Sequence, residues 1–231
     1  KQRNALIKEF GADSEEVANF ADNYSKENPY PDAKLPGKTP EKFAEGLIST
    51  ENRNEFRPFI TPDYKTLYFS TYPKYNMKKK KKKEEWTQED KYQKKLYYAL
   101  WQMERTSSGW TKPVKVHFSK HTGDLEPSMS PDGKRFYFTS HRKPAEGPFD
   151  SNIWMAEKVN GQWGNLKMLP FNNEESEWYV TETNSGRLYY SRYNMDRQHD
   201  LYVVNPEKPD QAERLKGVNT TFFDFDPYVD P

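Results

Sequence analysis

Hydrophobic and polar residues alternate along this chain in short runs, and the same run recurs several times. NEFRPFITPDYKTLYFST at 54–71 aligns with GDLEPSMSPDGKRFYFTS at 123–140 and, with one residue deleted, with SEWYVTETNSGRLYYSR at 176–192. FDFDPYVDP at 223–231 matches the opening of the same unit and stops at its turn. Each full copy predicts an alternating strand, a turn, and a second strand with the aromatic enrichment typical of strands.

The turns of the three copies are TPDY, SPDG and TNSG. In such turns Pro presets φ, Asp bonds back to the backbone, and Gly supplies a positive φ. Gly133 and Gly186 take that last role, whereas Tyr64 stands where Gly is expected. The third copy also lacks the Pro and Asp, with Asn184 and Ser185 in their places.

A second half-unit follows each pair of strands. LWQMERTSSGWTKPVKV at 100–116 aligns with IWMAEKVNGQWGNLKML at 153–169, and DLYVVNPEKPDQAERLKGV at 200–218 is a third copy. Each predicts a third strand, a polar hairpin loop and a fourth strand. Tryptophans mark the same two positions in the first two copies: Trp101 and Trp110, then Trp154 and Trp163. Their fixed place in the repeat favours packing between units over a sugar-stacking platform.

Four antiparallel strands per unit, repeated along the chain, predict an all-β fold of the β-propeller class. The repeat is about 50 residues once an insertion around 76–95 is set aside, somewhat longer than a WD-type blade. Three full units and part-units at both ends are visible, while a closed propeller typically has 4–8 blades. We therefore expect residues 40–231 to be a propeller that is incomplete at its C-terminal side, with six blades in the complete ring.

The residues before the first hairpin divide into two parts. PEKFAEGLIST at 40–50 occupies the position that fourth strands occupy before later units, so we expect a lone outer strand that completes the last blade of the ring. Residues 1–39 do not repeat and are predicted to hold an N-terminal helix and a linker. The helix is expected over 14–26, with Ser14 as its cap.

The composition supports a folded chain and removes several function classes. Hydrophobic residues are 33% of the sequence, but aromatic residues are 16%, whereas disordered chains are poor in aromatic residues. The formal net charge of +1 predicts no general attraction to nucleic acid. There is no cysteine, and no apolar run approaches the roughly 20 residues of a membrane-spanning helix.

Two strings, SPDGKRFYFTS and SNIWMAEK, resemble the WD40-like repeat of TolB-type propellers. SEWYVTETNSGRLYYS and FAEGLISTENRNEFRP are similar to variants in exported TolB-like proteins of Bacteroidetes-type bacteria. The resemblance covers about 40–231. It implies a periplasmic, outer-membrane-associated or secreted scaffold, although no signal segment is present in this chain. Proteins with these repeats are mostly exported scaffolds or surface proteins, some of them fused to peptidoglycan-binding or peptidase domains.

One acidic residue recurs at the start of every unit. The aligned positions, which we call the strand-start acids, are Glu55, Asp124, Glu177 and Asp224. Acids that begin successive innermost strands would converge near the central channel and could bind a cation or a basic partner segment. The alternative is that each carboxylate accepts backbone N–H groups within its own unit, since a feature present in every unit usually serves the unit.

The residue two positions after each strand-start acid varies, which is how repeated scaffolds individualise a binding face. We call these the recognition positions: Arg57, Glu126, Tyr179 and Asp226. They are our candidates for contacting a partner.

A run of six lysines lies inside the insertion of the first unit: Lys78, Lys79, Lys80, Lys81, Lys82 and Lys83. Adjacent like charges repel one another and stay solvated unless an anionic partner neutralises them. The run is therefore either a basic loop that contacts an anionic partner, namely anionic lipid, lipopolysaccharide, nucleic acid or an acidic protein, or a solvated insertion without a partner.

Catalytic, metal and cofactor motifs are absent from the sequence. The histidines, His117, His121, His141 and His199, show no metal-ligand spacing of the HExxH kind. There is no GxSxG elbow, GxGxxG or GxxxxGK[ST]. We expect no catalytic residue, no metal and no cofactor.

These observations favour a non-catalytic exported propeller that binds another protein or a cell-envelope component, with no nucleic acid. The alternative is a carbohydrate-active propeller enzyme or a glycan-binding module with carboxylates facing the channel.

We predict that replacing 78–83 with a Gly/Ser linker leaves the melting temperature nearly unchanged, because 76–95 has no counterpart in the other two complete units. If the lysines bind an anionic partner, the replacement weakens that binding. Wild-type binding should also fall steeply with salt, since the Debye length is about 8 Å in physiological buffer. Thermal unfolding and binding at two salt concentrations measure both effects. A large loss of stability would mean that the lysines belong to a blade.

Overall fold

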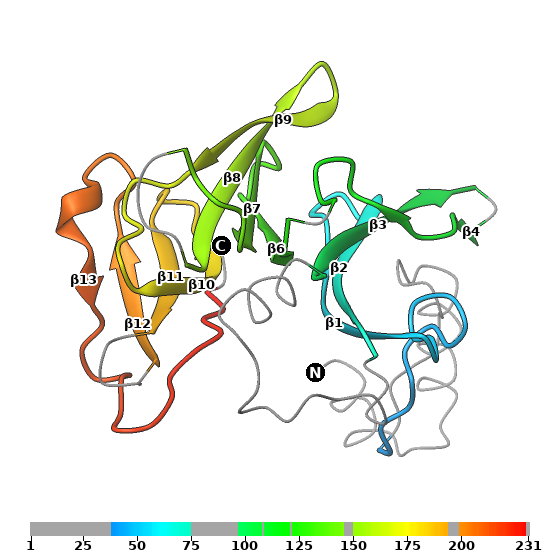
Figure 1. The fold of residues 1–231 in the computed structure, drawn as a ribbon, viewed down its shortest axis with the longest axis horizontal. Coiled ribbons are helices and arrows are strands. Elements are labelled where there is room, and N and C mark those ends of the chain that lie inside the picture. Colours follow the sequence, from blue (N-terminus) through cyan, green and yellow to red (C-terminus); the bar gives the residue numbers. More distant parts are fainter. Residues whose placement is uncertain are drawn as a thin grey trace, which may run out of the picture.

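The computed structural model of the chain describes residues 38–74, 97–107, 109–120, 122–145, 150–193 and 199–229. Figure 1 shows three antiparallel sheets arranged side by side. The first has five strands and each of the other two has four. The helix expected at 14–26, the lysine run and His121 lie outside the described residues. Within them, the helical element is the short 3-10 turn η3, Pro209–Gln211.

Each unit forms one sheet whose strands follow one another from the inside outward, as in a propeller blade. Blade 1 contains β1 (Arg53–Ile60), β2 (Thr66–Pro73) and β3 (Ala99–Thr106), with β4 (Gly109–Trp110) and β5 (Val114–Lys115) both paired to β3. Blade 2 contains β6 (Asp124–Met129), β7 (Arg135–Ser140), β8 (Asn152–Val159) and β9 (Gln162–Met168). Blade 3 contains β10 (Ser176–Glu182), β11 (Leu188–Tyr193), β12 (His199–Val204) and β13 (Glu213–Arg214). The predicted all-β fold with antiparallel propeller-type blades is confirmed.

The turns between the first two strands have the predicted chemistry. In blade 2, Lys134 N–H donates to Asp132 Oδ1 at 3.1 Å, and Gly133 N–H donates to Ser130 O at 2.9 Å. Gly133 has a φ of 70°. Tyr64 adopts the same conformation, with a φ of 55°, although its side chain makes that region unfavourable. The turn geometry is therefore imposed on blade 1 by the surrounding strands.

The hydrophobic cores lie between blades. Side chains alternate between the two faces of a strand, so Phe136 and Phe138 of β7 pack toward blade 1 with Tyr68 and Leu100. Tyr137, between them, faces the opposite way and packs against blade 3 with Leu188, Tyr190 and Val204. Blade 2 thus buries its two faces against different neighbours.

Polar contacts also cross these interfaces. Trp163 Nε1–H of blade 2 donates to the hydroxyl of Tyr68 of blade 1 at 2.9 Å, as the predicted packing role of the tryptophans requires. Between blades 2 and 3, Glu182 accepts from Arg135 Nη2 at 2.7 Å and from the Tyr137 hydroxyl at 2.8 Å. These contacts fix how neighbouring blades are aligned.

The prediction of an outer strand over 40–50 is wrong. Residues 43–49 form turns with one isolated bridge between Glu45 and Ser49, because Ala44 and Gly46 both have positive φ and Ile48 N–H donates to Ala44 O. This places Ala44 and Ile48 on the face of blade 1 formed by Leu67, Phe69 and Met103. The connectors before the other blades also place apolar side chains in a core. These are Val116 and Phe118 before blade 2, and Leu169 and Phe171 before blade 3.

We predict that Phe136→Ala lowers the free energy of unfolding by about 3–5 kcal/mol, the range for truncating a buried aromatic side chain. Phe136 is fully buried between blades 1 and 2. Trp154→Ala should cost less, because its ring is only partly buried in the same core. Chemical denaturation measures both, with Phe222→Ala as a control, since that side chain is 77% exposed. A cost below about 1 kcal/mol for Phe136→Ala would contradict this packing.

Candidate functional site

The strand-start acids are bound by groups of their own units. Glu55 Oε1 accepts the Thr50 N–H at 3.1 Å, and Glu177 Oε1 accepts the Asn173 N–H at 3.3 Å. Asp224 accepts the Thr220 N–H at 2.5 Å. For Glu55 and Glu177 the carboxylate ties the first strand to the connector before it, and Asp224 makes the same contact within the segment after blade 3. The geometry therefore favours the structural alternative for these acids over ligand binding.

Three of the acids also pair with an arginine that the sequence analysis missed. Arg53 Nε lies 2.9 Å from Glu55, and Arg192 Nε lies 2.9 Å from Glu177. Arg142 Nη2 lies 2.7 Å from both oxygens of Asp124. Each guanidinium also lies over an aromatic ring at the same position of the third strand: Trp101 at 4.5 Å, Trp154 at 5.1 Å and Tyr202 at 4.8 Å. The arginines come from different places in the repeat, which hid them from the alignment.

Burial makes these pairs costly to break. Asp124 and Glu177 are fully buried. Desolvation raises the pKa of Glu177, and the positive charge of Arg192 opposes that rise. Removing one partner of such a pair leaves a buried charge without compensation. These carboxylates therefore hold the strand starts in place.

Three of the four recognition positions, Arg57, Glu126 and Tyr179, lie in a β-bulge that recurs in every blade. In blade 2 the pairing passes from Leu125↔Thr139 to Ser128↔Tyr137, so one extra residue is inserted on the innermost strand. The same register shift follows Phe56 in β1 and Trp178 in β10. Pro often fits such a position because it has no N–H to donate to the ladder. The residue after the recognition position is Pro58, Pro127 and Pro227 in three of the four units.

All four recognition residues have left-handed backbone, with φ of 53° at Arg57, 59° at Glu126, 56° at Tyr179 and 63° at Asp226. In a bulge of this kind Gly is the usual residue, and a side chain costs about 1–2 kcal/mol. Four different polar residues occupy the position and none is Gly. Because the strained backbone is kept in all four units, these side chains are candidates for a functional role.

The structure brings these four side chains together. Arg57 forms an ion pair with Asp226, and its guanidinium lies 5.3 Å from the centre of the Tyr179 ring. Tyr179 N–H donates to Glu126 Oε2 at 3.2 Å. Residues of three blades and of the segment after blade 3 therefore form one cluster, which we call the axial cluster.

Glu126 is the buried member of the axial cluster. It is 3% exposed, and its Oε2 also accepts the Thr139 hydroxyl at 3.0 Å. Desolvation raises the pKa of Glu126 to about 7, while the charge of Arg57 and the bond from Tyr179 N–H oppose the rise. Its carboxyl group is therefore close to half protonated near neutral pH.

A continuous belt of rings lies on the same face of the blades, the end at which each innermost strand begins. We call this end the top face and the rings the aromatic belt. Successive centroids are 5.5–6.3 Å apart from Tyr72 through Tyr98, His141 and Trp178 to Tyr179. Such edge and tilted contacts are the preferred geometry for aromatic pairs. The belt gives the top face an apolar surface around the axial cluster.

Among the described residues, the buried polar atoms of the top face without a hydrogen-bond partner include Trp178 Nε1 and His199 Nδ1. Burial also lowers the pKa of His199, which favours its neutral form. Buried polar groups are normally paired with protein or water.

No group of three or more histidine, aspartate or glutamate side chains in the described part of the chain could hold a metal ion. His141 Nδ1 lies 3.0 Å from the Ser151 hydroxyl. None of the helices that the structure describes has the length and apolar composition needed to span a bilayer.

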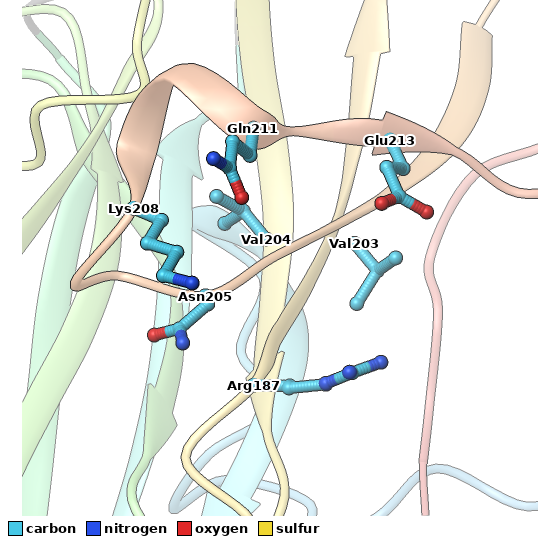
Figure 2. Close-up of a pocket in the computed structure, with 7 residues that line it drawn as sticks. All are labelled: Arg187, Val203, Val204, Asn205, Lys208, Gln211 and Glu213. Atoms are coloured by element: carbon cyan, nitrogen blue, oxygen red, sulfur yellow. The ribbon is translucent and has the colours of Figure 1, made fainter.

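A shallow cavity of about 200 Å³ lies at the outer side of blade 3 (Figure 2). It is lined by Val203 and Val204 of β12 and by polar side chains from the β12–β13 connection, including Lys208 and Gln211. None of the strand-start acids or recognition residues lines this cavity. The sequence-derived candidates and the cavity are therefore separate features.

No protein-family model and no curated protein sequence match this chain. Among solved structures, it is similar to a putative TolB from Agrobacterium tumefaciens, with a TM-score of 0.47 and 16% identity over 71% of this chain and 50% of that chain. A puromycin hydrolase has a TM-score of 0.49 and 13% identity, over 74% of this chain and 23% of that one. For an α-L-arabinofuranosidase from Lactobacillus brevis the TM-score is 0.40 and the identity 16%, over 72% and 56% of the two chains.

The chain thus spans about half the length of the putative TolB and less than a quarter of the puromycin hydrolase. Similarity at these values concerns the fold only, which the three blades already establish. Activity and partners have to be argued from the top face.

We predict that Glu126→Gln flattens the pH dependence of stability. Between pH of about 4.5 and 7, folded Glu126 keeps a proton that the unfolded chain releases, so the free energy of unfolding falls as pH rises through this window. The fall is at most about 1.4 kcal/mol per pH unit. Gln keeps an acceptor for Thr139 and for Tyr179 N–H but does not titrate.

Chemical denaturation of both proteins at several pH values isolates Glu126, since Arg57, Asp226 and Tyr179 are unchanged in both. Parallel curves for the two proteins between pH 4.5 and 7 would contradict the assignment.

Proposed function

We propose that this chain is a non-catalytic propeller scaffold that binds another protein or a cell-envelope component through its top face. The carrying observation is the axial cluster: four positions with left-handed backbone, three of them in the repeated bulge, hold four different polar side chains that lie together. The blades repeat one backbone structure, whereas the residue at the recognition position differs in each unit. Such an arrangement suits recognition of a specific partner. The strand-start acids form hydrogen bonds and ion pairs within their own blades, so the recognition positions are the better candidates for contacting a partner.

The proposed location is the periplasm, the outer membrane or the extracellular space. The support is the resemblance of the repeats to those of exported TolB-type proteins. The lysine run remains a candidate contact for an anionic partner.

A second candidate is a glycan-binding or carbohydrate-active propeller. The observation that favours it is the aromatic belt beside Glu126, because a carboxyl group with a pKa of about 7 is suited to proton transfer. Against it, Glu126 is buried and already accepts two hydrogen bonds through one oxygen.

We predict that Tyr179→Ala reduces capture of a partner from an envelope extract of the source organism at least about tenfold, the effect of losing a central aromatic contact worth more than 1.4 kcal/mol. The matched control is Lys134→Ala, on the turn at the opposite end of blade 2, where the side chain is 79% exposed. Thermal unfolding verifies that both variants are folded.

Equal capture by Tyr179→Ala, Lys134→Ala and wild type would contradict a binding role for the top face. Hydrolysis of a polysaccharide that is lost in Glu126→Gln would instead establish the second candidate.

A further inference from the structure

Glu126 lies in blade 2, which has a described blade on each side, and it forms hydrogen bonds to all three blades. Its backbone N–H donates to the Ser70 hydroxyl of blade 1 at 2.8 Å. Its Oε2 accepts the Thr139 hydroxyl of blade 2 at 3.0 Å and the Tyr179 N–H of blade 3 at 3.2 Å. One buried carboxyl group is therefore in contact with both neighbouring blades at the centre of the top face.

The hydrogen bond from Tyr179 acts directly on a recognition position. Tyr179 has a φ of 56° and lies in the bulge of β10, between the paired residues Trp178 and Thr181. Its N–H donates to Glu126 Oε2. An ionised acceptor makes such a bond roughly twice as strong as a neutral one. The charge of Glu126 therefore determines how firmly the Tyr179 backbone is held.

The same charge acts on Arg57 of blade 1. Burial lowers the pKa of Arg57, and the negative charge of Glu126 opposes that fall. Arg57 in turn forms an ion pair with Asp226 and lies over the Tyr179 ring. Protonation of Glu126 thus removes one of the negative charges that attract the guanidinium at this position.

The titratable groups that face Glu126 come from both neighbouring blades. They are Arg57 and Tyr98 of blade 1 and Tyr179 of blade 3. Burial raises the pKa of both tyrosines, and an arginine stays charged at any physiological pH. Desolvation raises the pKa of Glu126 to about 7, so Glu126 is the member of this set that changes charge between pH values of about 6 and 8. His141 packs behind Tyr98, with ring centroids 5.9 Å apart.

We propose that Glu126 couples recognition at the top face to pH: its carboxylate form holds Tyr179 and Arg57 in the arrangement that binds the partner, and protonation releases them. The inference rests on the proposed function and names the regulation of the same site. The apparent affinity is then reduced by the fraction of molecules in the anionic form. With a pKa of about 7 that fraction is about 0.9 at pH 8 and about 0.1 at pH 6, so binding weakens about tenfold.

The first test needs no partner. The full chain is labelled with nitrogen-15 tyrosine, and the backbone amide resonance of Tyr179 is assigned by its absence from Tyr179→Phe. Its chemical shift should titrate with a midpoint near pH 7, because its acceptor Glu126 Oε2 changes charge. In Glu126→Gln it should stay constant. The amide of Tyr189, a paired residue of β11, is an internal control.

The second test measures capture from the envelope extract at pH 8 and pH 6, at one salt concentration. It follows the component whose capture is lost in Tyr179→Ala and determines the concentration of immobilised protein that captures half of it. For wild type this concentration should be about tenfold higher at pH 6. For Glu126→Gln it should be the same at both pH values and close to the wild-type value at pH 6.

Two controls isolate Glu126 from other titrating groups. Groups of the partner and His141 are unchanged in Glu126→Gln, so a pH effect that arises from them would persist in this variant. Glu157→Gln removes an exposed acid of β8 that pairs with Lys167, and it should keep the wild-type pH dependence. Thermal unfolding at both pH values verifies that each variant is folded.

A Tyr179 amide that does not titrate, or that titrates equally in Glu126→Gln, overturns the inference. Tyr179-dependent capture with the same pH dependence in wild type and Glu126→Gln also overturns it, while the scaffold role stands. The proposed function fails separately, through capture at pH 8 that ignores Tyr179→Ala. That failure leaves the amide titration intact, so the two results are distinguishable.

Discussion

The acid at the start of each innermost strand, fully buried in blades 2 and 3, is the constraint on which the described structure depends. Desolvating a carboxylate is expensive, and it is tolerated only where a positive partner and hydrogen bonds compensate it. Asp124 has both, from Arg142, Ser140 and Thr122. Because these partners come from the connector and from the second strand, the acid fixes where the first strand begins relative to its neighbours. The register of the whole blade follows from that point.

The bulge that follows each of these acids determines where the recognition side chains point. With the strand start fixed by the acid, the extra residue after Leu125 turns the Glu126 backbone into the left-handed region and releases its side chain from the alternation of the ladder. The same displacement acts on Arg57 and Tyr179 in the neighbouring blades. Side chains that would otherwise face adjacent blades can then meet at the axis. The acids and the recognition positions thus have complementary roles. The acids fix where each innermost strand begins, and the recognition positions place side chains at the axis.

The blades also depend on one another for stability. A single four-stranded sheet has two apolar faces, and the cores here are formed between sheets. The pair Tyr68 and Phe136 unites blades 1 and 2, and Tyr137 with Tyr190 does the same for blades 2 and 3. The connector at 43–49 covers part of the first face. A repeated fold of this kind has nearest-neighbour energetics, in which each interface stabilises both blades beside it.

Much of this could be predicted from the sequence because the deciding interactions are local. Alternation with a period of two identifies strands, and the residues of a turn select its geometry, so the strands and the SPDG-type turns follow from short strings. The repetition of these strings predicted the blades. The variable residue two positions after each strand-start acid identified the recognition positions. The error at 40–50 arose because apolar spacing alone does not distinguish a strand from a turn closed by positive φ at Ala44 and Gly46.

The tertiary structure decided which distant groups meet. Arg53, Arg142 and Arg192 perform one task from unrelated places in the repeat, so an alignment could not find them. The contact of Arg57 with Asp226 joins residues far apart in the chain, and it depends on the angles between blades and on the strain of each bulge. The sequence by itself therefore determined the blade and its variable positions. Their convergence was decided only by packing between blades, because side-chain distances across an axis are set by rigid-body geometry that no local pattern encodes.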